Sequence, residues 1–376
     1  MKQRILKKQI KNSLKTGFVV ALFGARRTGK TVLMKEILNE IPSKKVLYVQ
    51  GDDMDISEIL SSQRLSILKS FVKGYDFLFI DEAQKITNIG QNLKLMTDGI
   101  PELGIFITGS SALDLKQNVG EPLTGRSKFF YLYPFSQNEL NEDYLTAKKH
   151  IETKLIYGMY PQVVMSDDIR SKTDVLTSIK NGYLLKDVLE LDNLKDTTFI
   201  LNLLRLIAFQ IGNDISYSEL ASNLNVSKNT VKRYLDILEK IYVIFSLSGF
   251  SRNLRKEYSK TPRYYFWDNG IRNVLISNFN TINLRDDIGK LWENFCISER
   301  LKYSNYNSFN ANYYFWRTYD QKEIDLIEEK NGFLNAFEFK WKNKKIKKPN
   351  IFFDTYKNSK YFNVNPENWL EILLSE

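Results

Sequence analysis

The stretch from 24 to 31 carries the residues best suited to chemistry. It reads G-A-R-R-T-G-K-T and fits the phosphate-binding loop pattern G-x-x-x-x-G-K-[ST] at every fixed position. The glycines allow a tight turn that points backbone N–H groups at phosphate oxygens, the lysine reaches the β- and γ-phosphates, and the last hydroxyl ligates Mg²⁺. The residues predicted to bind ATP are Gly24, Ala25, Arg26, Arg27, Thr28, Gly29, Lys30 and Thr31.

Two further elements must position this loop. The apolar run Phe18–Phe23 precedes it and is typical of a buried strand, and the helical run Val32–Leu38 follows it. The amino end of that helix adds partial positive charge beside the phosphates. A chance match to a strand, turn and helix is the alternative, and the correct flanking elements weigh against it.

A second buried strand, Phe77–Ile80, ends in Asp81 and Glu82. In phosphate-loop nucleotidases an aspartate at this point holds the Mg²⁺ ion. A glutamate directly after it is placed to polarise the attacking water, so the pair favours ATP hydrolysis. The alternative is that the two acids cap the helix that follows.

Two more polar positions suit the same site. The predicted strand Gly104–Thr108 is followed by Ser110 and Ser111, either of which would sense the γ-phosphate. Arg126 precedes the apolar strand Phe129–Leu132 and is a candidate arginine finger, acting within the chain or from a neighbouring subunit. Its structural alternative is a surface salt bridge.

A second constellation lies near the carboxyl end. Asp325 falls in an alternating strand, the turn Asn331-Gly332 follows, and Glu338 and Lys340 share one face of the return strand. An upstream amphipathic helix adds Glu293. Asp325, Glu338 and Glu293 would hold Mg²⁺ or Mn²⁺ beside a phosphodiester, and Lys340 would activate the attacking water. The alternative is that these are ordinary solvent-exposed side chains of a hairpin.

Residues 215–250 carry a helix-turn-helix pattern. Ser218–Leu224 is predicted as the first helix, Ser227 as the cap of the second, and the strand of a wing as beginning at Tyr242. The exposed face of the second helix offers side chains suited to phosphates and base edges of DNA. These are Lys228, Asn229, Lys232 and Arg233. A purely structural packing module is the alternative.

Composition narrows the remaining possibilities. The 376 residues carry a formal net charge of +10, which favours an acidic partner such as nucleic acid, although a lysine-rich, AT-biased genome would give the same balance. Lysines concentrate after residue 339, at Lys340, Lys342, Lys344, Lys345, Lys347 and Lys348. A single cysteine, Cys296, excludes an internal disulfide and a cysteine zinc site, and one histidine, His150, excludes chemistry that needs paired histidines.

We expect a cytoplasmic protein without a membrane partner, because no apolar run is long enough to cross a bilayer and no signal-peptide core follows the first residues. The fold class is α/β. Four parts are expected: a parallel-sheet ATPase core at 1–145, a helical lid at 146–212, a winged helix at 213–270 and an α/β nuclease-like domain at 271–376.

Nearly the full length resembles the prokaryotic AAA-type ATPases, related to the STAND branch, that carry a winged helix and a PD-(D/E)XK nuclease-like carboxyl-terminal domain of unknown function. The residues that carry this resemblance are Gly24–Thr31, Phe77–Gln84, Ile107–Ser111, Gly125-Arg126, Pro134–Ser136 with Glu139, Tyr265–Ile271, and the set Asp325, Glu338 and Lys340. The resemblance implies an architecture and leaves the biological partners of the family mostly unassigned.

Two hypotheses follow. The leading one is an ATPase, with Glu82 as base and Arg126 as finger, coupled to a module that binds DNA, with cleavage of the DNA left open. The competing one is a regulatory ATPase that binds protein partners and uses the winged helix and nuclease-like fold as an inactive scaffold. The sequence leaves open whether the chain forms a homo-oligomer.

Overall fold

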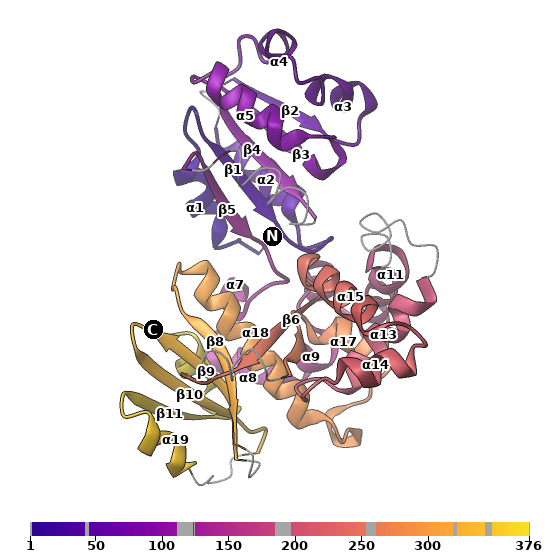
Figure 1. The fold of residues 1–376 in the computed structure, drawn as a ribbon, viewed down its shortest axis with the longest axis vertical. Helices are drawn as coiled ribbons and strands as arrows, with labels where there is room; N and C mark the ends of the chain where they lie inside the picture. The colour runs from indigo at the N-terminus through magenta and orange to yellow at the C-terminus, as the bar shows by residue number, and fades with distance from the viewer. Residues whose placement is uncertain are drawn as a thin grey trace. The chain divides into compact units, whose positions relative to one another are not determined.

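The chain forms two compact units, each with its own sheet (Figure 1). The computed structural model describes residues 2–41, 45–110, 123, 125–184, 197–252, 261–318, 322–342 and 348–375. The first unit contains Met1–Tyr133 and Lys240–Tyr242, and the second contains Pro134–Glu239 and Val243–Glu376.

The first unit is built on a five-stranded parallel sheet in the order β2-β3-β4-β1-β5. Its strands are β1 (Val19–Phe23), β2 (Val46–Gln50), β3 (Phe77–Asp81), β4 (Gly104–Gly109) and β5 (Ser127–Tyr131). Its helices are α1 (Leu6–Ser13), α2 (Lys30–Asn39), α3 (Met54–Leu60), α4 (Leu65–Phe71), the short η1 (Ala83–Lys85) and α5 (Ile89–Gly99). The expected strands therefore form, and the sheet is parallel as predicted.

Helices cover both faces of this sheet, which explains why its central strands β1, β3 and β4 are buried at every position and mostly apolar. Val19, Ala21 and Phe23 point to the face that packs on α3, α4 and α5, where Leu68 and Met96 belong to the same core. The alternate residues of β1 face the other side, where α2 packs against β3 and β4. The sheet is thus rigid beneath the loops that follow its strands.

The second unit contains helices before, between and after its strands. They are α7 (Gln137–Leu140), α8 (Tyr144–Lys149), α9 (Ile151–Tyr157), α10 (Pro161–Val164), α11 (Ile169–Ile179), the π-helical η2 (Lys180–Leu184), α13 (Thr197–Phe209), α14 (Tyr217–Asn223), α15 (Lys228–Lys240), α17 (Asn269–Leu275), η3 (Ile282–Leu284), α18 (Ile288–Tyr306), α19 (Asn350–Thr355) and α20 (Trp369–Leu373).

A six-stranded mixed sheet completes this unit, in the order β11-β10-β9-β8-β6-β7. Its strands are β6 (Ile244–Gly249), β7 (Arg263–Phe266), β8 (Asn312–Arg317), β9 (Glu323–Lys330), β10 (Phe333–Phe339) and β11 (Ser359–Val364). Strand β6 pairs antiparallel with β7 and parallel with β8, through Ser248 and Gly249. One sheet therefore runs across the expected boundary at residue 270.

The predicted hairpin is confirmed. Strands β9 and β10 pair antiparallel with Phe337 opposite Leu326. Asn331 and Gly332 between them have φ values of 53° and 81°, which suit a tight hairpin turn. Ser227 also caps α15 as expected, since its hydroxyl accepts a hydrogen bond from the Thr230 amide at 3.1 Å. Cys296 is fully buried.

The sequence predicted a domain boundary near residue 145. The units divide earlier, after Tyr133. The segment after Tyr133 is anchored in the second unit by a buried ion pair of α18. The Gln137 amide donates to Glu299 at 2.7 Å, and the Lys302 ammonium donates to the Phe135 carbonyl at 3.3 Å. The strength of these buried charge-assisted bonds places residues 134–142 with the helix that holds them.

The helical segment at 146–212 also packs inside the second unit, whereas we expected a lid of the ATPase core. The Asn273 amide of α17 donates to the carbonyls of Leu155 and Ile156 at the end of α9, at 3.0 and 2.8 Å. Asp268 accepts from the Met159 amide at 2.6 Å and caps α17 through Ile271. No described helix is both long and apolar enough to span a membrane.

Candidate functional site

The phosphate-loop residues lie at the carboxyl edge of the first sheet, between β1 and α2. Gly24 has a φ of 152°, and a Cβ at this position would stand 2.1 Å from the Leu132 carbonyl oxygen. Gly29 has a φ of 98° and precedes the first residue of α2. Both positions therefore require glycine, as the motif predicts.

Lys30 lies folded over this loop. Its ammonium donates to the carbonyls of Gly24 at 2.8 Å and Ala25 at 3.0 Å, and its side chain is buried. The Thr28 hydroxyl also donates to the Ala25 carbonyl, and the Arg4 guanidinium donates to the Thr28 carbonyl. Thr31 follows Lys30 in the first turn of α2. The loop is thus closed by its own side chains and presents a lysine at a helix amino terminus.

Asp81 ends β3 at the same edge of the sheet and is buried. One carboxylate oxygen accepts from the Thr108 hydroxyl of β4, and the other accepts from the Tyr48 hydroxyl of β2 at 3.3 Å. The Thr108 hydroxyl also accepts from the Glu82 amide at 3.1 Å. A single threonine therefore fixes both acids of the motif.

Glu82 has a left-handed backbone with a φ of 54°, which is uncommon outside glycine. Its carboxylate accepts a hydrogen bond from the side-chain amide of Gln84, and that amide also donates to the Ser110 hydroxyl at 3.1 Å. Ser110 is thereby joined to the predicted base. Ser111 lies outside the described residues.

Tyr48, Gln84 and Thr108 were given no role by the sequence. Thr108 faces Asp81 because β3 and β4 pair in parallel, with Ile80 opposite Ile107. The sequence signal for Thr108 is a polar residue placed one position before the end of an otherwise apolar strand. It becomes informative only when the strand order is known.

Arg126 lies at the amino ends of the parallel strands, at the opposite end of the sheet from the phosphate loop. Strands β1 and β5 are parallel, with Val19 opposite Ser127, so Arg126 stands level with the start of β1 and Gly24 with its end. Six residue steps at about 3.3 Å each separate the two levels, which exceeds the reach of an arginine side chain. Arg126 instead pairs with Asp98, both largely exposed. A finger acting on the nucleotide of its own chain is therefore excluded by the topology.

The edge formed by the phosphate loop, Asp81, Glu82 and Ser110 fits a nucleoside triphosphate with Mg²⁺. Backbone amides, an ammonium and a helix amino terminus suit the phosphates, and the Thr31 hydroxyl and Asp81 carboxylate are the hard oxygen ligands that Mg²⁺ prefers. When bound, Mg²⁺ would neutralise charge on the β- and γ-phosphates. Open parallel sheets bind ligands at this edge of their strands.

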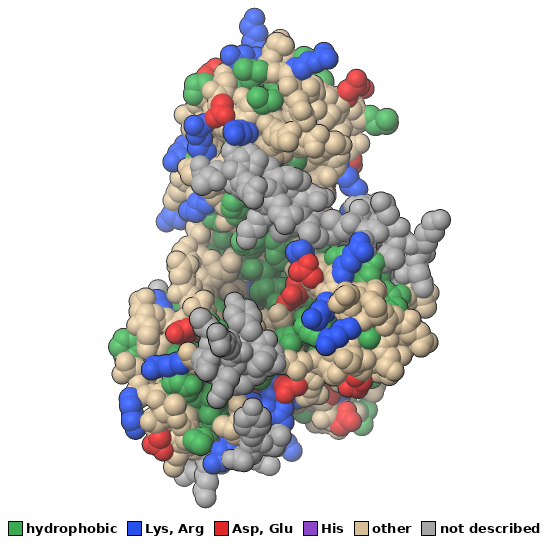
Figure 2. Space-filling model, in the orientation of Figure 1, with side chains coloured by type: hydrophobic (Ala, Val, Ile, Leu, Met, Phe, Trp, Pro, Cys, Tyr) green, Lys and Arg blue, Asp and Glu red, His purple; other side chains and the backbone are tan. Residues whose placement is uncertain are grey.

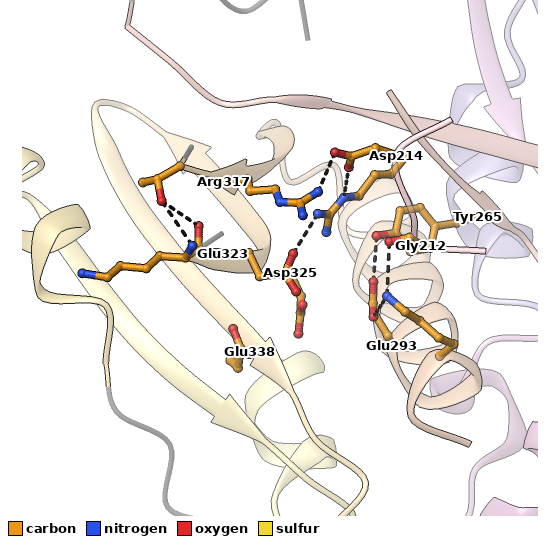
Figure 3. Close-up of polar contacts among 12 residues, drawn as sticks. Gly212, Asp214, Tyr265, Glu293, Arg317, Glu323, Asp325 and Glu338 are labelled. Atoms are coloured by element: carbon orange, nitrogen blue, oxygen red, sulfur yellow. Dashed lines mark hydrogen bonds and ion pairs between the residues drawn. The ribbon is translucent and has the colours of Figure 1, made fainter. Parts of the chain in front are cut away.

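The second constellation lies wholly in the second unit, where the structure brings its members together. Glu293 comes from α18, Asp325 from β9 and Glu338 from β10 (Figure 3). Extending the register of β9 and β10 places Asp325 opposite Glu338 on one face of the sheet. The Lys340 ammonium lies 2.7 Å from Glu338 and 3.8 Å from Asp325. The Asp325 carboxylate also accepts from the Phe339 amide at 2.8 Å.

Burial and mutual repulsion perturb this cluster. Desolvation, and then the charge of Asp325, raise the pKa of Glu293 to about 7 and the pKa of Glu338 to about 7. Burial also raises the pKa of Asp325. Burial alone would lower the pKa of Lys340, but Asp325 and Glu338 outweigh it and raise that pKa. Strongly perturbed groups clustered in one place are typical of functional sites.

Metal binding at this cluster stays a prediction. Among the residues that the structure describes, no group of three or more His, Cys, Asp or Glu is arranged to hold a metal ion. The arrangement as it stands gives Asp325 and Glu338 the Lys340 ammonium as their shared cation. The cluster therefore does not fit a metal in this conformation.

Two residues missed by the sequence reasoning hold Glu293. The Tyr265 hydroxyl donates to its Oε1 at 2.9 Å, and the Lys290 ammonium donates to its Oε2 at 3.1 Å (Figure 3). Lys290 precedes Glu293 by one helical turn, which is a recognisable spacing. Tyr265 reaches it from β7, a contact that only the fold reveals.

The predicted DNA-facing residues of α15 are all exposed. Lys232 stacks its ammonium over the Tyr217 ring of α14, 5.3 Å from the centroid. Asn229 and Arg233 line a hollow of 810 Å³ between α13 and the helix pair, so they face a concave surface. Figure 2 shows basic side chains on this face interspersed with acidic and apolar ones. Contact with DNA stays a prediction, as does the winged helix.

Comparison with known proteins identifies the first unit. Residues 16–141 match the AAA domain family. This part of the chain is similar to AAA-type P-loop domains. Residues 148–282 match a domain of unknown function (DUF8612), and residues 288–368 match another (DUF4143). The first of these spans the helical segment, the helix pair α14–α15 and α17 as one family domain.

The relatives that match over much of this chain are uncharacterized proteins, and the chain spans about two thirds of their length. An uncharacterized protein of Methanocaldococcus jannaschii is 25% identical over 280 residues, covering 69% of this chain and 63% of that protein. An uncharacterized protein of Haemophilus influenzae is 28% identical, covering 68% of this chain and 69% of its own length. One of Mycobacterium tuberculosis is 25% identical over 340 residues, covering 88% and 72%.

Solved structures give weaker matches. DnaA from Aquifex aeolicus with bound AMPPCP is 15% identical, covers 62% of this chain and 86% of its own, and has a TM-score of 0.29. A RuvB mutant of Thermotoga maritima is 20% identical, covers 64% and 86%, and has a TM-score of 0.30. Scores this low do not establish a shared fold over the whole chain.

Proposed function

We propose that the protein hydrolyses ATP in its AAA domain and that hydrolysis controls a nucleic-acid-facing second unit. The observation that carries the ATPase proposal is the Thr108 hydroxyl, which joins the buried Asp81 to the backbone of Glu82 beside the phosphate loop. Asp81 would hold Mg²⁺, and Glu82 would polarise the attacking water. Lys30 would leave the Gly24 and Ala25 carbonyls for the phosphates.

Calorimetry with ATP and Mg²⁺ tests the binding step. Wild-type protein should bind, and Lys30→Ala should show no measurable heat of binding, because the variant loses the point charge that meets the β- and γ-phosphates. Undiminished binding by Lys30→Ala would remove the phosphate loop from the proposal. Lys35→Ala, one turn further along α2 and over the Tyr48 ring, is the matched control and should bind as wild type does.

For the second unit we propose action on a phosphodiester, supported by the acid and lysine cluster at Asp325, Glu338 and Lys340. Cutting of plasmid DNA in the presence of Mg²⁺ tests it. Cutting should vanish in Asp325→Ala and in Lys340→Ala, and Asp354→Ala, an exposed acid of α19, should cut normally. Cutting that survives both cluster substitutions would assign it to a contaminant.

One observation favours a second candidate function. Because the cluster is not arranged to hold a metal, a regulatory ATPase whose second unit binds protein partners fits this conformation of the acids. The two candidates differ in their response to DNA. Absence of both plasmid cutting and DNA-stimulated ATP hydrolysis would reject the nucleic-acid proposal in favour of the regulatory one.

A further inference from the structure

A cleft of 350 Å³ opens beside the acid and lysine cluster of the second unit. It is lined by Lys322, Glu323, Glu338, Lys348, Pro349, Asn350 and Tyr361. Glu323 and Glu338 belong to neighbouring strands of the sheet (Figure 3), so the cleft continues the surface that carries Asp325 and Lys340. A pocket of this size accommodates one small ligand group, comparable to a single nucleotide unit.

Tyr361 gives this cleft an unused hydrogen-bond donor. Its hydroxyl oxygen is buried and has no hydrogen-bond partner among the described residues, although its ring packs against Phe353 at 5.8 Å between centroids. A buried polar group without a partner costs free energy, so such a group needs an explanation in a folded protein. A ligand oxygen in the cleft would satisfy it. At neutral pH a tyrosine hydroxyl is protonated and donates.

Two lysines supply charge of the opposite sign to the acids at the same opening. Lys322 and Lys348 are both exposed, and the Lys348 ammonium lies 3.6 Å from the centre of the Phe353 ring. Phe353 thus contacts both the Tyr361 ring and the Lys348 ammonium, two of the residues that line the cleft. Ammonium groups and a hydroxyl donor together match the oxygens of a phosphate group.

We propose that this cleft binds one phosphate of a single nucleic-acid strand, next to the bond on which the Asp325, Glu338 and Lys340 cluster acts. The Tyr361 hydroxyl donates to a phosphate oxygen, and Lys322 and Lys348 neutralise the charge. Glu338 borders the cleft and belongs to the cluster, so the bound strand passes from one to the other. This subsite rests on the proposed function of the second unit.

Binding of a fluorescein-labelled dT15 strand to the full chain, without ATP and in EDTA, tests the subsite separately from cutting. In Lys322→Ala/Lys348→Ala the slope of log affinity against log salt should shrink by about 0.7, because the two lysines together neutralise one phosphate and one phosphate contact on a single strand contributes about 0.7. The control Lys357→Ala/Lys360→Ala removes the same charge. Lys360 precedes Tyr361 on β11 and so points to the opposite face of the sheet. The slope of log affinity against log salt for this control variant should equal that of wild type.

Tyr361→Phe tests the hydroxyl. Affinity for dT15 should fall two- to fivefold with the salt slope unchanged, because the lost donor carries no charge. Tyr313→Phe removes a tyrosine hydroxyl of β8 that does not line the cleft, so it is the control and should bind as wild type does. An unchanged slope in the double lysine variant, or equal losses in Tyr361→Phe and Tyr313→Phe, would overturn the subsite.

A competition measurement distinguishes a nucleic-acid strand from a free nucleotide as the source of the phosphate. Comparing binding with cutting then distinguishes the subsite proposal from the phosphodiester proposal. Thymidine 5′-monophosphate should compete with dT15 only weakly; competition as strong as that of an unlabelled strand would assign the cleft to a free nucleotide and overturn strand binding. If wild-type protein binds dT15 through these residues but cuts nothing, the phosphodiester proposal fails and the subsite stands. If it cuts and the lysine and tyrosine variants bind normally, the subsite fails alone.

Discussion

Glu82 is the proposed general base for ATP hydrolysis, and its carboxylate accepts a hydrogen bond from the Gln84 side-chain amide. The same amide reaches Ser110, at the end of the neighbouring strand β4. A γ-phosphate drawn to Ser110 would compete for this amide and release Glu82 for the attacking water. Under the proposed function, Gln84 would therefore make Glu82 available as the base only when ATP is bound.

Glu82→Gln should bind ATP normally and hydrolyse it at least about a hundredfold more slowly, because the amide cannot accept the proton from water. Filter binding with labelled ATP measures the trapped nucleotide, and phosphate release measures turnover. Turnover at the wild-type rate would remove Glu82 from the role of base. Glu102→Gln, an exposed acid at the turn before β4, is the control and should leave both unchanged.

The acids of the second unit predict a pH dependence. The folded-state pKa of Glu293 and of Glu338 is about 7, above the ordinary value of 4.5, because of burial and of Asp325. Between these values the folded state binds more protons than the unfolded state, so the free energy of unfolding falls as pH rises from about 4.5 to about 7.

Thermal unfolding in EDTA at pH 5 and pH 8 measures this effect through tryptophan fluorescence. The wild-type midpoint should be a few degrees lower at pH 8, and Glu338→Gln should recover part of that loss, since it removes a buried charge. A Glu338→Gln midpoint at pH 8 equal to or below that of wild type would show that the ion pair with Lys340 outweighs the burial of Glu338.

At the scale of elements, the chain from β7 to α17 is built around Asp268. Its carboxylate accepts from the amides of Met159 and Ile271, and so fastens the end of α9 to the start of α17. A Cβ on Gly270 would stand 2.1 Å from the Tyr157 carbonyl, so the same turn requires glycine. The stretch Tyr265–Ile271 is one of the motifs that carry the family resemblance, which assigns it no role. In the structure its role is in packing.

Asp268→Ala should lower the free energy of unfolding of the second unit by about 2–4 kcal/mol, because it leaves the buried Met159 amide unpaired and removes a helix cap. All five tryptophans of the chain lie in this unit, so their fluorescence in urea reports its unfolding. Asp143→Ala removes an exposed cap of α8 and should cost about 1 kcal/mol. Equal losses in the two variants would contradict the account.

Local patterns in the sequence predicted the strands β1, β3 and β4, the phosphate loop, the β9–β10 hairpin and the cap at Ser227. Contacts made across the sheets were not predictable, because Thr108 meets Asp81 and Tyr265 meets Glu293 only through strand order and packing. Whether Arg126 could act within its own chain was not predictable for the same reason, since its reach depends on which end of β5 lies beside the phosphate loop.

At the scale of the whole molecule, the topology leaves Arg126 a role only at a neighbour's nucleotide. Mixing the Arg126→Ala and Glu82→Gln variants tests this. The first variant retains the base and lacks the finger, and the second retains the finger and lacks the base. If Arg126 acts between subunits, the mixture should recover up to about a quarter of wild-type ATP hydrolysis, because a minority of interfaces pair an intact base with an intact finger. Activity of the mixture equal to the average of the two variants would assign Arg126 to its surface ion pair with Asp98.

The rate of ATP hydrolysis with and without DNA, at about 50 mM and about 200 mM salt, tests most directly the claim that an AAA ATPase controls a nucleic-acid-facing unit. The account predicts that DNA raises the rate severalfold at the lower salt concentration and little at the higher one, because phosphate-dominated binding weakens steeply with salt. An ATPase rate that DNA leaves unchanged at the lower concentration would contradict it.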